Sequence, residues 1–452
     1  MKKTAFRAHE RGHPTQLPSE HVDWITQPVT RFLRIEAAAG AVLLFFTLVA
    51  LALSNSPWAE DFLSLWDTPI GITVGSLEFQ RSLQEWINDA LMTLFFFLVA
   101  LELKREIVLG ELKTPRLAML SISGAIGGML VPALIYLLFQ LDQPGQHGWG
   151  IVMATDTAFV IACLILLGPR VPKSLRVFML SLAIIDDIGA IVVVAVGYGE
   201  EIHFYAIGLA VIGFIVVKIM AVLGVRNLAV YLCIGGLIWF AVDASGIHPT
   251  VIGVVLGLMT PTRRWVNEQR LLTIMECVVP PPLPNQRDVL HLDRQVLKTA
   301  EAAAREALSP LERLEILLHP WVGFVIMPLF AFANAGVQLS FSELSGSLYI
   351  AIFAGLVIGK PIGIILFCGL ATLLKLAVRP PELPWLYLVA GGMLAGIGFT
   401  MSLFIAHLAL SPALVDVAKL GILSASLFSA LAGMMLLSWL LKRDASYKDN
   451  QT

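Results

Sequence analysis

Two adjacent carboxylates, Asp186 and Asp187, stand in the middle of an apolar run, SLRVFMLSLAIIDDIGAIVVVAVGYG, at positions 174–199. An α-helix rises about 1.5 Å per residue, so Asp186 lies roughly 18 Å along this run, near the centre of a ~30 Å hydrocarbon core. Each ionised carboxylate at that depth costs on the order of 2.5–3.5 kcal/mol, so the pair must face a polar cavity or a partner. Such residues usually bind and release ions, and the pair therefore predicts a transport site; a buried structural pair is the alternative.

Two other polar features interrupt apolar segments. Asp156 follows Thr155 in GIVMATDTAF, and a Thr-Asp pair is unfavourable inside a helix but favourable as an N-cap, which predicts a local break. Lys360 stands midway along another segment, in GLVIGKPIGI, directly before Pro361. An ammonium group at mid-membrane requires a carboxylate partner or a cluster of acceptors, so Lys360 is a candidate counter-charge.

A glycine-rich stretch, GGMLAGIGFTMS at 391–402, contains Gly396, Gly398 and Thr400. Close packing of helices is one explanation for small residues at this spacing. The predicted topology favours a second explanation, a helix interrupted at a binding site. Of twelve predicted spans, spans 3–5 (within 117–199) and spans 10–12 (within 348–441) run in opposite directions, and the interrupted span is the middle member of each triplet. Interrupted segments at matching places in inverted halves indicate a transporter site.

Broken helices that cross would place partial charges of about half an electron inside the membrane. Asp156 can face the positive N-terminal ends, and Lys360 can face the negative C-terminal ends. Asp186 and Asp187 would then remain to bind and exchange cations.

The composition agrees with a polytopic membrane protein: 57% of the residues are hydrophobic, 14% are charged, and the mean hydropathy is +0.80. A net charge of −2 argues against a nucleic-acid partner, which would require a basic face. The four cysteines are scattered, without the spacing of a zinc site or a disulfide framework, and no motif indicates a cofactor.

Twelve apolar runs have the length of membrane spans. They lie near residues 36–54, 87–103, 117–139, 149–168, 174–199, 203–222, 228–242, 247–260, 317–338, 348–374, 385–408 and 419–441. Lys and Arg gather in both tails and in every second connection, with Arg81 and Lys419 as the exceptions, which places both termini in the cytoplasm. The sequence thus predicts a single transmembrane domain over 36–441 between cytoplasmic tails at 1–35 and 442–452.

Two connections are distinctive. Residues 67–80, DTPIGITVGSLEFQ, alternate apolar and polar residues around a Gly-Ser turn and predict a β-hairpin on the outer side, which could pair with its copy in a homodimer. On the inner side, the long segment 261–315 contains a proline run and then a charged, alanine-rich stretch, which predicts a stiff linker followed by a surface helix. A spacer or regulatory role and no role at all are equally compatible with this loop.

The motifs together resemble one family. Residues 30–441, with ATDTAF, LAIIDDIGA, VIGKPIGI, LFAFANAGV, GIGFTMSLFIA and LELKRE, are similar to the NhaA family of bacterial sodium/proton antiporters. The resemblance implies an all-α protein of the inner membrane, with twelve spans, an inverted-topology repeat and broken helices in spans 4 and 11. It also implies electrogenic, pH-regulated exchange of Na⁺ or Li⁺ for about two H⁺, by alternating access.

The resemblance also assigns roles to residues. Asp187 would be the principal carboxylate for Na⁺ and H⁺, with Asp186 beside it and paired to Lys360, while Asp156 and Thr155 support the site. A pH-response cluster is implied for Glu102, Arg105, Glu106, Glu315 and His319, for which ordinary charged flanks of the spans are the alternative.

Near these motifs, two positions differ from the family pattern and a third matches it. Ile316 stands where the family often has a histidine and Glu312 where a lysine is common, so the pH-sensing surface of this chain would differ from that of the family. His248, in SGIHPTVIG, matches a family histidine, and a polar residue at a helix end is an equal interpretation.

Other classes fit less well. An intramembrane aspartyl protease would need YD and GxGD motifs on separate helices, and a prenyltransferase would need DDxxD, where this chain has Ala190 at the last position. A cation channel is disfavoured because a buried lysine raises the barrier for cations. A proton-coupled transporter of another cation or substrate is the main alternative.

Overall fold

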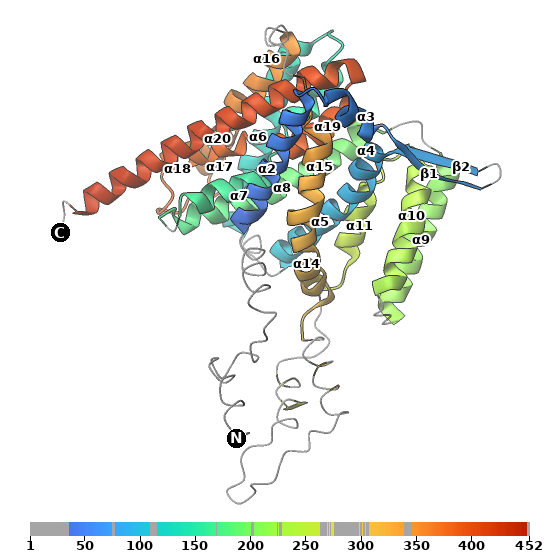
Figure 1. Ribbon diagram of the computed structural model, residues 1–452. Helices are drawn as coiled ribbons and strands as arrows, with labels where there is room; N and C mark the ends of the chain where they lie inside the picture. The colour runs from blue at the N-terminus through green and yellow to red at the C-terminus, as the bar shows by residue number, and fades with distance from the viewer. Residues whose placement is uncertain are drawn as a thin grey trace, which may run out of the picture.

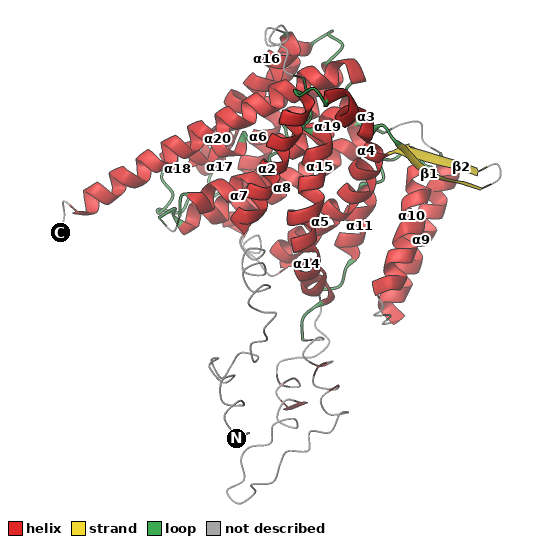
Figure 2. Cartoon of the chain, viewed as in Figure 1, coloured by secondary structure: helices red, strands yellow, loops and turns green. Residues whose placement is uncertain are grey.

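The computed structural model describes residues 36–74, 77–108, 115–168, 170–199, 203–223, 225, 228–262, 307–338 and 346–449, together with isolated positions between 269 and 303. The predicted tail at 1–35 and most of the 261–315 loop lie outside these residues. Within the described ranges the protein is helical apart from one two-stranded hairpin and the connections (Figure 2). This is the architecture of an all-α membrane protein.

The helices follow one another along the chain in a single bundle (Figure 1). Their bounds are α2 Glu36–Ser54, α3 Ala59–Trp66, α4 Leu83–Trp86, η1 Ile87–Leu91, α5 Met92–Val108, α6 Pro115–Gln140, η3 Gln146–Val152, α7 Thr157–Leu166, α8 Lys173–Gly197, α9 Phe204–Leu223, α10 Leu228–Asp243, α11 Val251–Met259, α14 Pro310–Trp321, η4 Val322–Ile326, α15 Met327–Asn334, α16 Ser347–Ala354, η6 Gly355–Gly359, α17 Lys360–Leu373, α18 Trp385–Ala395, α19 Phe399–Ala409 and α20 Pro412–Asp449.

Eight of the described helical segments are long and apolar enough to cross a membrane, and the bent pair α18 and α19 would make a ninth. Shorter apolar helices occupy Ala38–Ser54 and Val230–Asp243, and α11 has only 9 residues. Each predicted run thus overlaps one or more helical segments, and some of these segments are shorter than the ~17–25 residues of a typical span.

The hairpin consists of β1, Pro69–Val74, and β2, Leu77–Ser82, paired antiparallel with Val74 opposite Leu77. Its second strand continues two residues beyond the predicted range of 67–80. Ser82 ends this strand and caps α4 by accepting a hydrogen bond from the Glu85 N–H, in a capping box. The hairpin therefore leads directly into the helices, and Figure 1 shows it projecting at the end of the molecule opposite α14.

Helix α17 is held against α6 by two glycines that face each other. A Cβ atom on Gly127 would lie less than 3.0 Å from the Gly363 carbonyl oxygen, and one on Gly363 would meet the Gly127 carbonyl in the same way. Small residues let helix backbones approach closely in membranes. Because Lys360 is the first residue of α17, this contact fixes the place from which its side chain extends.

Two π-helical turns accompany prolines at the same offset. Turn η4 ends at Ile326, two residues before Pro328, and η6 ends at Gly359, two residues before Pro361. Proline has no N–H to donate to the preceding turn, and a π turn redistributes the carbonyls that this leaves without a partner. The widened turn at η6 comes immediately before Lys360.

The apolar core divides in two. The larger cluster contains buried side chains from most of the bundle, including Phe330 and Phe404. A smaller cluster lies within the α9, α10 and α11 group and includes Ile238 and Ile252. Figure 1 shows α9 and α10 side by side at the edge of the molecule, next to the hairpin.

Candidate ion-binding site

The two helix interruptions touch each other in the middle of the bundle. Between η3 and α7 the chain leaves the helical conformation at residues 153–156, and α18 and α19 are bent by 47° at a break of the same kind. The Asp156 N–H donates to the Ile397 carbonyl oxygen at 2.6 Å, which joins one break to the other. Four helix ends therefore meet in the interior of the protein.

Asp156 stands at the N-termini of two helices at once. Its Oδ1 accepts from the Phe159 N–H at 3.2 Å as the N-cap of α7, as the Thr-Asp pair predicts. Its Oδ2 accepts from the Thr400 N–H at 3.0 Å and from the Thr400 hydroxyl at 2.5 Å, in the first turn of α19. One buried carboxylate thereby faces the positive ends of both helix dipoles.

The two glycines of the α18–α19 break differ in what they allow. A Cβ atom on Gly396 would lie less than 3.0 Å from the Leu356 carbonyl oxygen in η6, so a larger residue there would push the backbones apart. A Cβ on Gly398 would meet the Ser402 hydroxyl, which donates to the Ile151 carbonyl oxygen at 2.6 Å, so a larger residue there would disturb this hydrogen bond and not a backbone contact. Gly396 is therefore the position at which close backbone approach requires glycine.

Lys360 is paired inside the bundle with Asp186 and Thr155. Its Nζ lies 2.5 Å from Asp186 Oδ2 and also donates to Thr155 Oγ1, and all three side chains are fully buried. The Thr155 hydroxyl lies 2.6 Å from Asp186 Oδ2 and 3.0 Å from the Ala395 carbonyl oxygen, and its single proton can serve one of them at a time. Ala395 is the last residue of α18, so the ammonium group is linked to that helix C-terminus through Thr155.

Asp187 has different surroundings from its neighbour. Its Oδ2 accepts a hydrogen bond from the Thr157 hydroxyl at 3.2 Å, and the described residues place no cationic side chain in an ion pair with it. The second oxygens of the two carboxylates, Asp186 Oδ1 and Asp187 Oδ1, are buried and accept no hydrogen bond from the described part of the chain. Buried carboxylate oxygens of this kind are suitable ligands for a hard cation.

The residues of the expected pH-response cluster come together on α5 and α14. Arg105 forms an ion pair with Glu315, and its Nη2 lies 3.5 Å from Glu106 Oε1. His319 Nδ1 lies 3.5 Å from Glu102 Oε1. Glu315 is buried, whereas Arg105 and His319 are 37% and 52% exposed. Figure 1 shows α14, which carries Glu315 and His319, at one end of the molecule.

One of the two departures in this region, Glu312, has a local structural explanation. Glu312 accepts from the Ser309 N–H at 2.8 Å in a capping box at the start of α14, so its carboxylate serves that helix end. Ile316 is exposed on the same helix.

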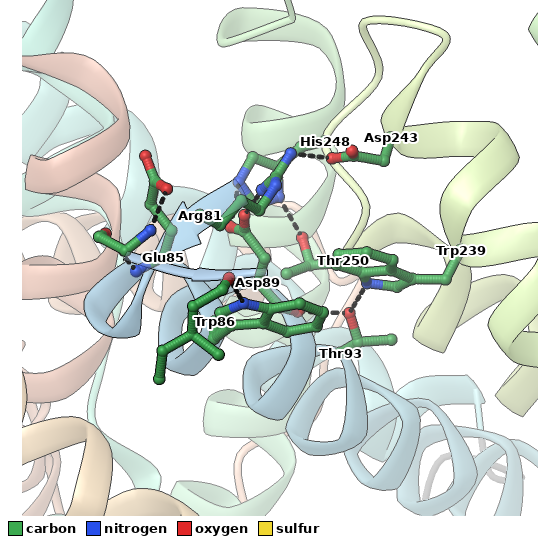
Figure 3. Close-up of polar contacts among 11 residues, drawn as sticks. Arg81, Glu85, Trp86, Asp89, Thr93, Trp239, Asp243, His248 and Thr250 are labelled. Atoms are coloured by element: carbon green, nitrogen blue, oxygen red, sulfur yellow. Dashed lines mark hydrogen bonds and ion pairs between the residues drawn. The ribbon is translucent and has the colours of Figure 1, made fainter. Parts of the chain in front are cut away.

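A second cluster of charges lies at the base of the hairpin, and the sequence indicated it only through the unusual position of Arg81. The guanidinium donates to Asp89 on η1 and to Asp243 at the end of α10, and lies 5.7 Å from the Trp239 ring (Figure 3). His248 Nε2 lies 3.5 Å from Asp89 Oδ1. Arg81 is thus held by two carboxylates.

Sequence reasoning also overlooked Thr157 and a group of neutral polar residues. Asn334 Nδ2 donates to Asn88 Oδ1 at 2.7 Å, and Gln84 Nε2 lies 3.0 Å from Asn334 Oδ1 and 3.3 Å from His407 Nε2. A neutral amide costs less free energy to bury than a charge does, so its presence in an apolar helix is less conspicuous in the sequence. Thr157 could have been found from its place next to Asp156 in ATDTAF.

Comparison with known proteins adds an independent result. A profile of the family described as Na⁺/H⁺ antiporter 1 matches residues 30–437. The Na⁺/H⁺ antiporter NhaA 2 of Vibrio vulnificus is 55% identical over 430 residues, covering 95% of this chain and 96% of its own length. The NhaA antiporter of Rhizobium meliloti is 55% identical over 94% of this chain and 98% of its own, and that of Rhodopirellula baltica is 47% identical over 94% and 97%.

Proposed function

This chain belongs to the Na⁺/H⁺ antiporter 1 family, and it is therefore a secondary transporter that exchanges Na⁺ for H⁺ and not an enzyme. We propose that Asp187 is the carboxylate at which the two ions compete. The observation that carries the proposal is the unequal pairing of the two aspartates. Asp186 is committed through one oxygen to Lys360, whereas Asp187 has a hydroxyl partner alone among the described residues and a free buried oxygen. A carboxylate that neutralises no cation of the protein is available to neutralise one from solution.

Competition at one site couples the two fluxes. An aspartate that binds Na⁺ must be ionised, and a protonated aspartate does not hold Na⁺, so each ion displaces the other. The free oxygen of Asp186 can complete the coordination of the ion. Li⁺ should be exchanged as well, since it is also a hard cation that prefers oxygen ligands.

We propose a stoichiometry of about two protons per Na⁺. Two groups can lose a proton when Na⁺ arrives, namely Asp187 itself and the Asp186–Lys360 pair, which holds one proton between its two members. Two charges entering for one leaving makes the exchange electrogenic, so the membrane potential and the proton gradient both expel Na⁺. The chain would reside in the bacterial inner membrane, in contact with lipid, with both termini in the cytoplasm, as the distribution of Lys and Arg favours.

The proposed mechanism is alternating access in a protein of twelve spans. The contact between the two helix breaks supports an inverted repeat of spans 3–5 and 10–12, because the middle member of each triplet is interrupted and the breaks meet. Asp156 accepts hydrogen bonds at the N-termini of α7 and α19 and so neutralises the positive ends of both helix dipoles. These two helices can therefore begin inside a membrane, where no water solvates their ends.

Two further parts of the chain receive proposed roles. The cluster of Arg105, Glu315 and their neighbours on α5 and α14 would adjust activity to pH, since it contains titratable groups in mutual contact. The hairpin would join two copies of the chain by pairing with its counterpart, because its strands have unpaired edges.

The proposal is tested with the purified full-length chain in proteoliposomes carrying a pH-sensitive dye. Asp187→Asn should abolish Na⁺-dependent proton flux while thermal unfolding in detergent remains cooperative. Asp142→Asn is the matched control, because Asp142 is exposed and has a positive φ of 59° that asparagine tolerates. Normal flux in Asp187→Asn would refute the assignment, and exchange of K⁺ in preference to Na⁺ would favour a transporter of another cation.

A further inference from the structure

Thr157 has a side chain that the proposed exchange does not use. It is the first residue of α7, it is half-buried, and its hydroxyl makes the 3.2 Å hydrogen bond to Asp187 Oδ2. Hydroxyls at helix N-termini usually bond to the local backbone. Here that position is already taken by the Asp156 carboxylate, so the Thr157 hydroxyl can reach across to α8.

The helix break explains why this contact is possible. Asp156 is extended, with φ −85° and ψ 96°, and residues on either side of an extended residue point in the same direction. In a continuous helix, residues two apart would point about 200° away from each other. Thr155 and Thr157 therefore both face α8, where one meets Asp186 and the other meets Asp187, while Asp156 between them bonds to Thr400 of α19.

We infer that Thr157 is a positioning residue of the cation site, which orients Asp187 and offers its hydroxyl oxygen to a cation bound there. The inference rests on the proposed role of Asp187. A hydroxyl that donates its proton to a carboxylate keeps lone pairs that can face a cation, so both functions are compatible. Because of the helix break, Thr155 would supply one hydroxyl to Asp186 and Thr157 would supply one to Asp187.

The hydrogen bond should also influence the competition between Na⁺ and H⁺. A bond to an ionised carboxylate is roughly twice as strong as one between neutral groups, so Thr157 favours the state of Asp187 that binds Na⁺. Four other charged groups act on Asp187. They are Asp186 on α8, Lys360 on α17, Asp156 directly before α7, and Glu102 on α5. None of these is altered by removing one hydroxyl.

The test compares Thr157→Val, which keeps the shape and removes the hydroxyl, with Thr157→Ser, which keeps the hydroxyl. In proteoliposomes, Thr157→Val should raise the half-saturating Na⁺ concentration about tenfold, the equivalent of one lost hydrogen bond to a charged group. Its activity profile should move to higher pH, because protons then compete more strongly for Asp187. Thr157→Ser should remain close to the wild type in both properties.

Thr372→Val is the matched control, since the Thr372 hydroxyl is half-buried but bonds to the Gly369 carbonyl of its own helix. Thermal unfolding separates a folding defect from a binding defect, and Thr157→Ala provides a second variant if valine does not fold. Wild-type affinity and pH profile in Thr157→Val or Thr157→Ala would overturn the inference, as would equal impairment of the serine and valine variants. These outcomes are distinct from failure of the proposed function, which would appear as full exchange in Asp187→Asn.

Discussion

Lys360 Nζ lies 2.5 Å from Asp186 Oδ2, and neither side chain is exposed to solvent. The two residues are 174 positions apart in the chain and are brought together by α17 and α8. Because a buried charge without a partner is costly, the pair fixes the relative placement of these helices as well as the charge of the site. Within the described ranges, the same pairing leaves Asp187 as the member of the aspartate pair that forms no ion pair with a cationic side chain.

Removing the lysine should therefore destabilise the protein. Lys360→Ala leaves Asp186 buried without its counter-charge, and we expect a loss of about 3–5 kcal/mol in unfolding free energy, seen as a lower Tm in detergent. Asp186→Asn in the same background should restore part of this loss, because the remaining partner is then neutral. An unchanged Tm in Lys360→Ala would show that the pair contributes nothing to stability.

Much of this site was predictable because charges inside apolar segments are energetically conspicuous. Asp186, Asp187, Asp156 and Lys360 could each be identified from position alone, and the N-cap role of Asp156 followed from the Thr-Asp pair. The division of partners between Asp186 and Asp187 could not be obtained from the residues alone. It depends on which way two side chains about 100° apart on one helix are turned, and that is set by packing against α7 and α17.

The fold shows the same contrast. Apolar runs located the helices and the alternation around Gly75 located the hairpin, because both signals are periodic in the sequence. The contact of Arg81 with Asp89 and Asp243 joins three separate elements, and no local pattern encodes which of them meet. The π turns before Pro328 and Pro361 were likewise missed, since a proline in an apolar run predicts a kink without specifying its form.

The facing glycines of α6 and α17 offer a test of packing. Gly363→Ala should force the two helices apart, because its Cβ would lie less than 3.0 Å from the Gly127 carbonyl oxygen, and it should lower both Tm and transport rate. Gly208→Ala is the control: nothing lies within 4 Å of a Cβ there, so this variant should be neutral or gain up to about 1 kcal/mol from helix propensity. Equal effects of the two substitutions would mean that the close approach is unimportant.

The Arg81 cluster should hold the base of the hairpin to the helices. Arg81→Gln removes the guanidinium from two carboxylates whose side chains are only 12% and 14% exposed. We expect the free energy of unfolding to fall by about 2 kcal/mol, which thermal unfolding at low and high salt would measure. Arg443→Gln is the comparison, since Arg443 is 52% exposed and pairs with the neighbouring Asp444 at 3.7 Å. A loss in Arg443→Gln as large as that in Arg81→Gln would contradict a specific role for the cluster (Figure 3).

The cluster on α5 and α14 yields a prediction about regulation in place of stability. Glu315→Gln removes the carboxylate that pairs with Arg105, so the guanidinium can act more strongly on Glu102 and Glu106. We therefore expect the pH profile of exchange to shift while the maximal rate stays near that of the wild type. Because Arg105 is 37% exposed, water can solvate its guanidinium when the partner is lost. The free energy of unfolding should therefore fall by no more than about 1 kcal/mol. Proton flux driven by Na⁺ and measured across the pH range distinguishes this from the alternative of simple charged flanks, for which Glu315→Gln would leave the profile where it is. Loss of all activity at every pH would instead place Glu315 in the transport step itself.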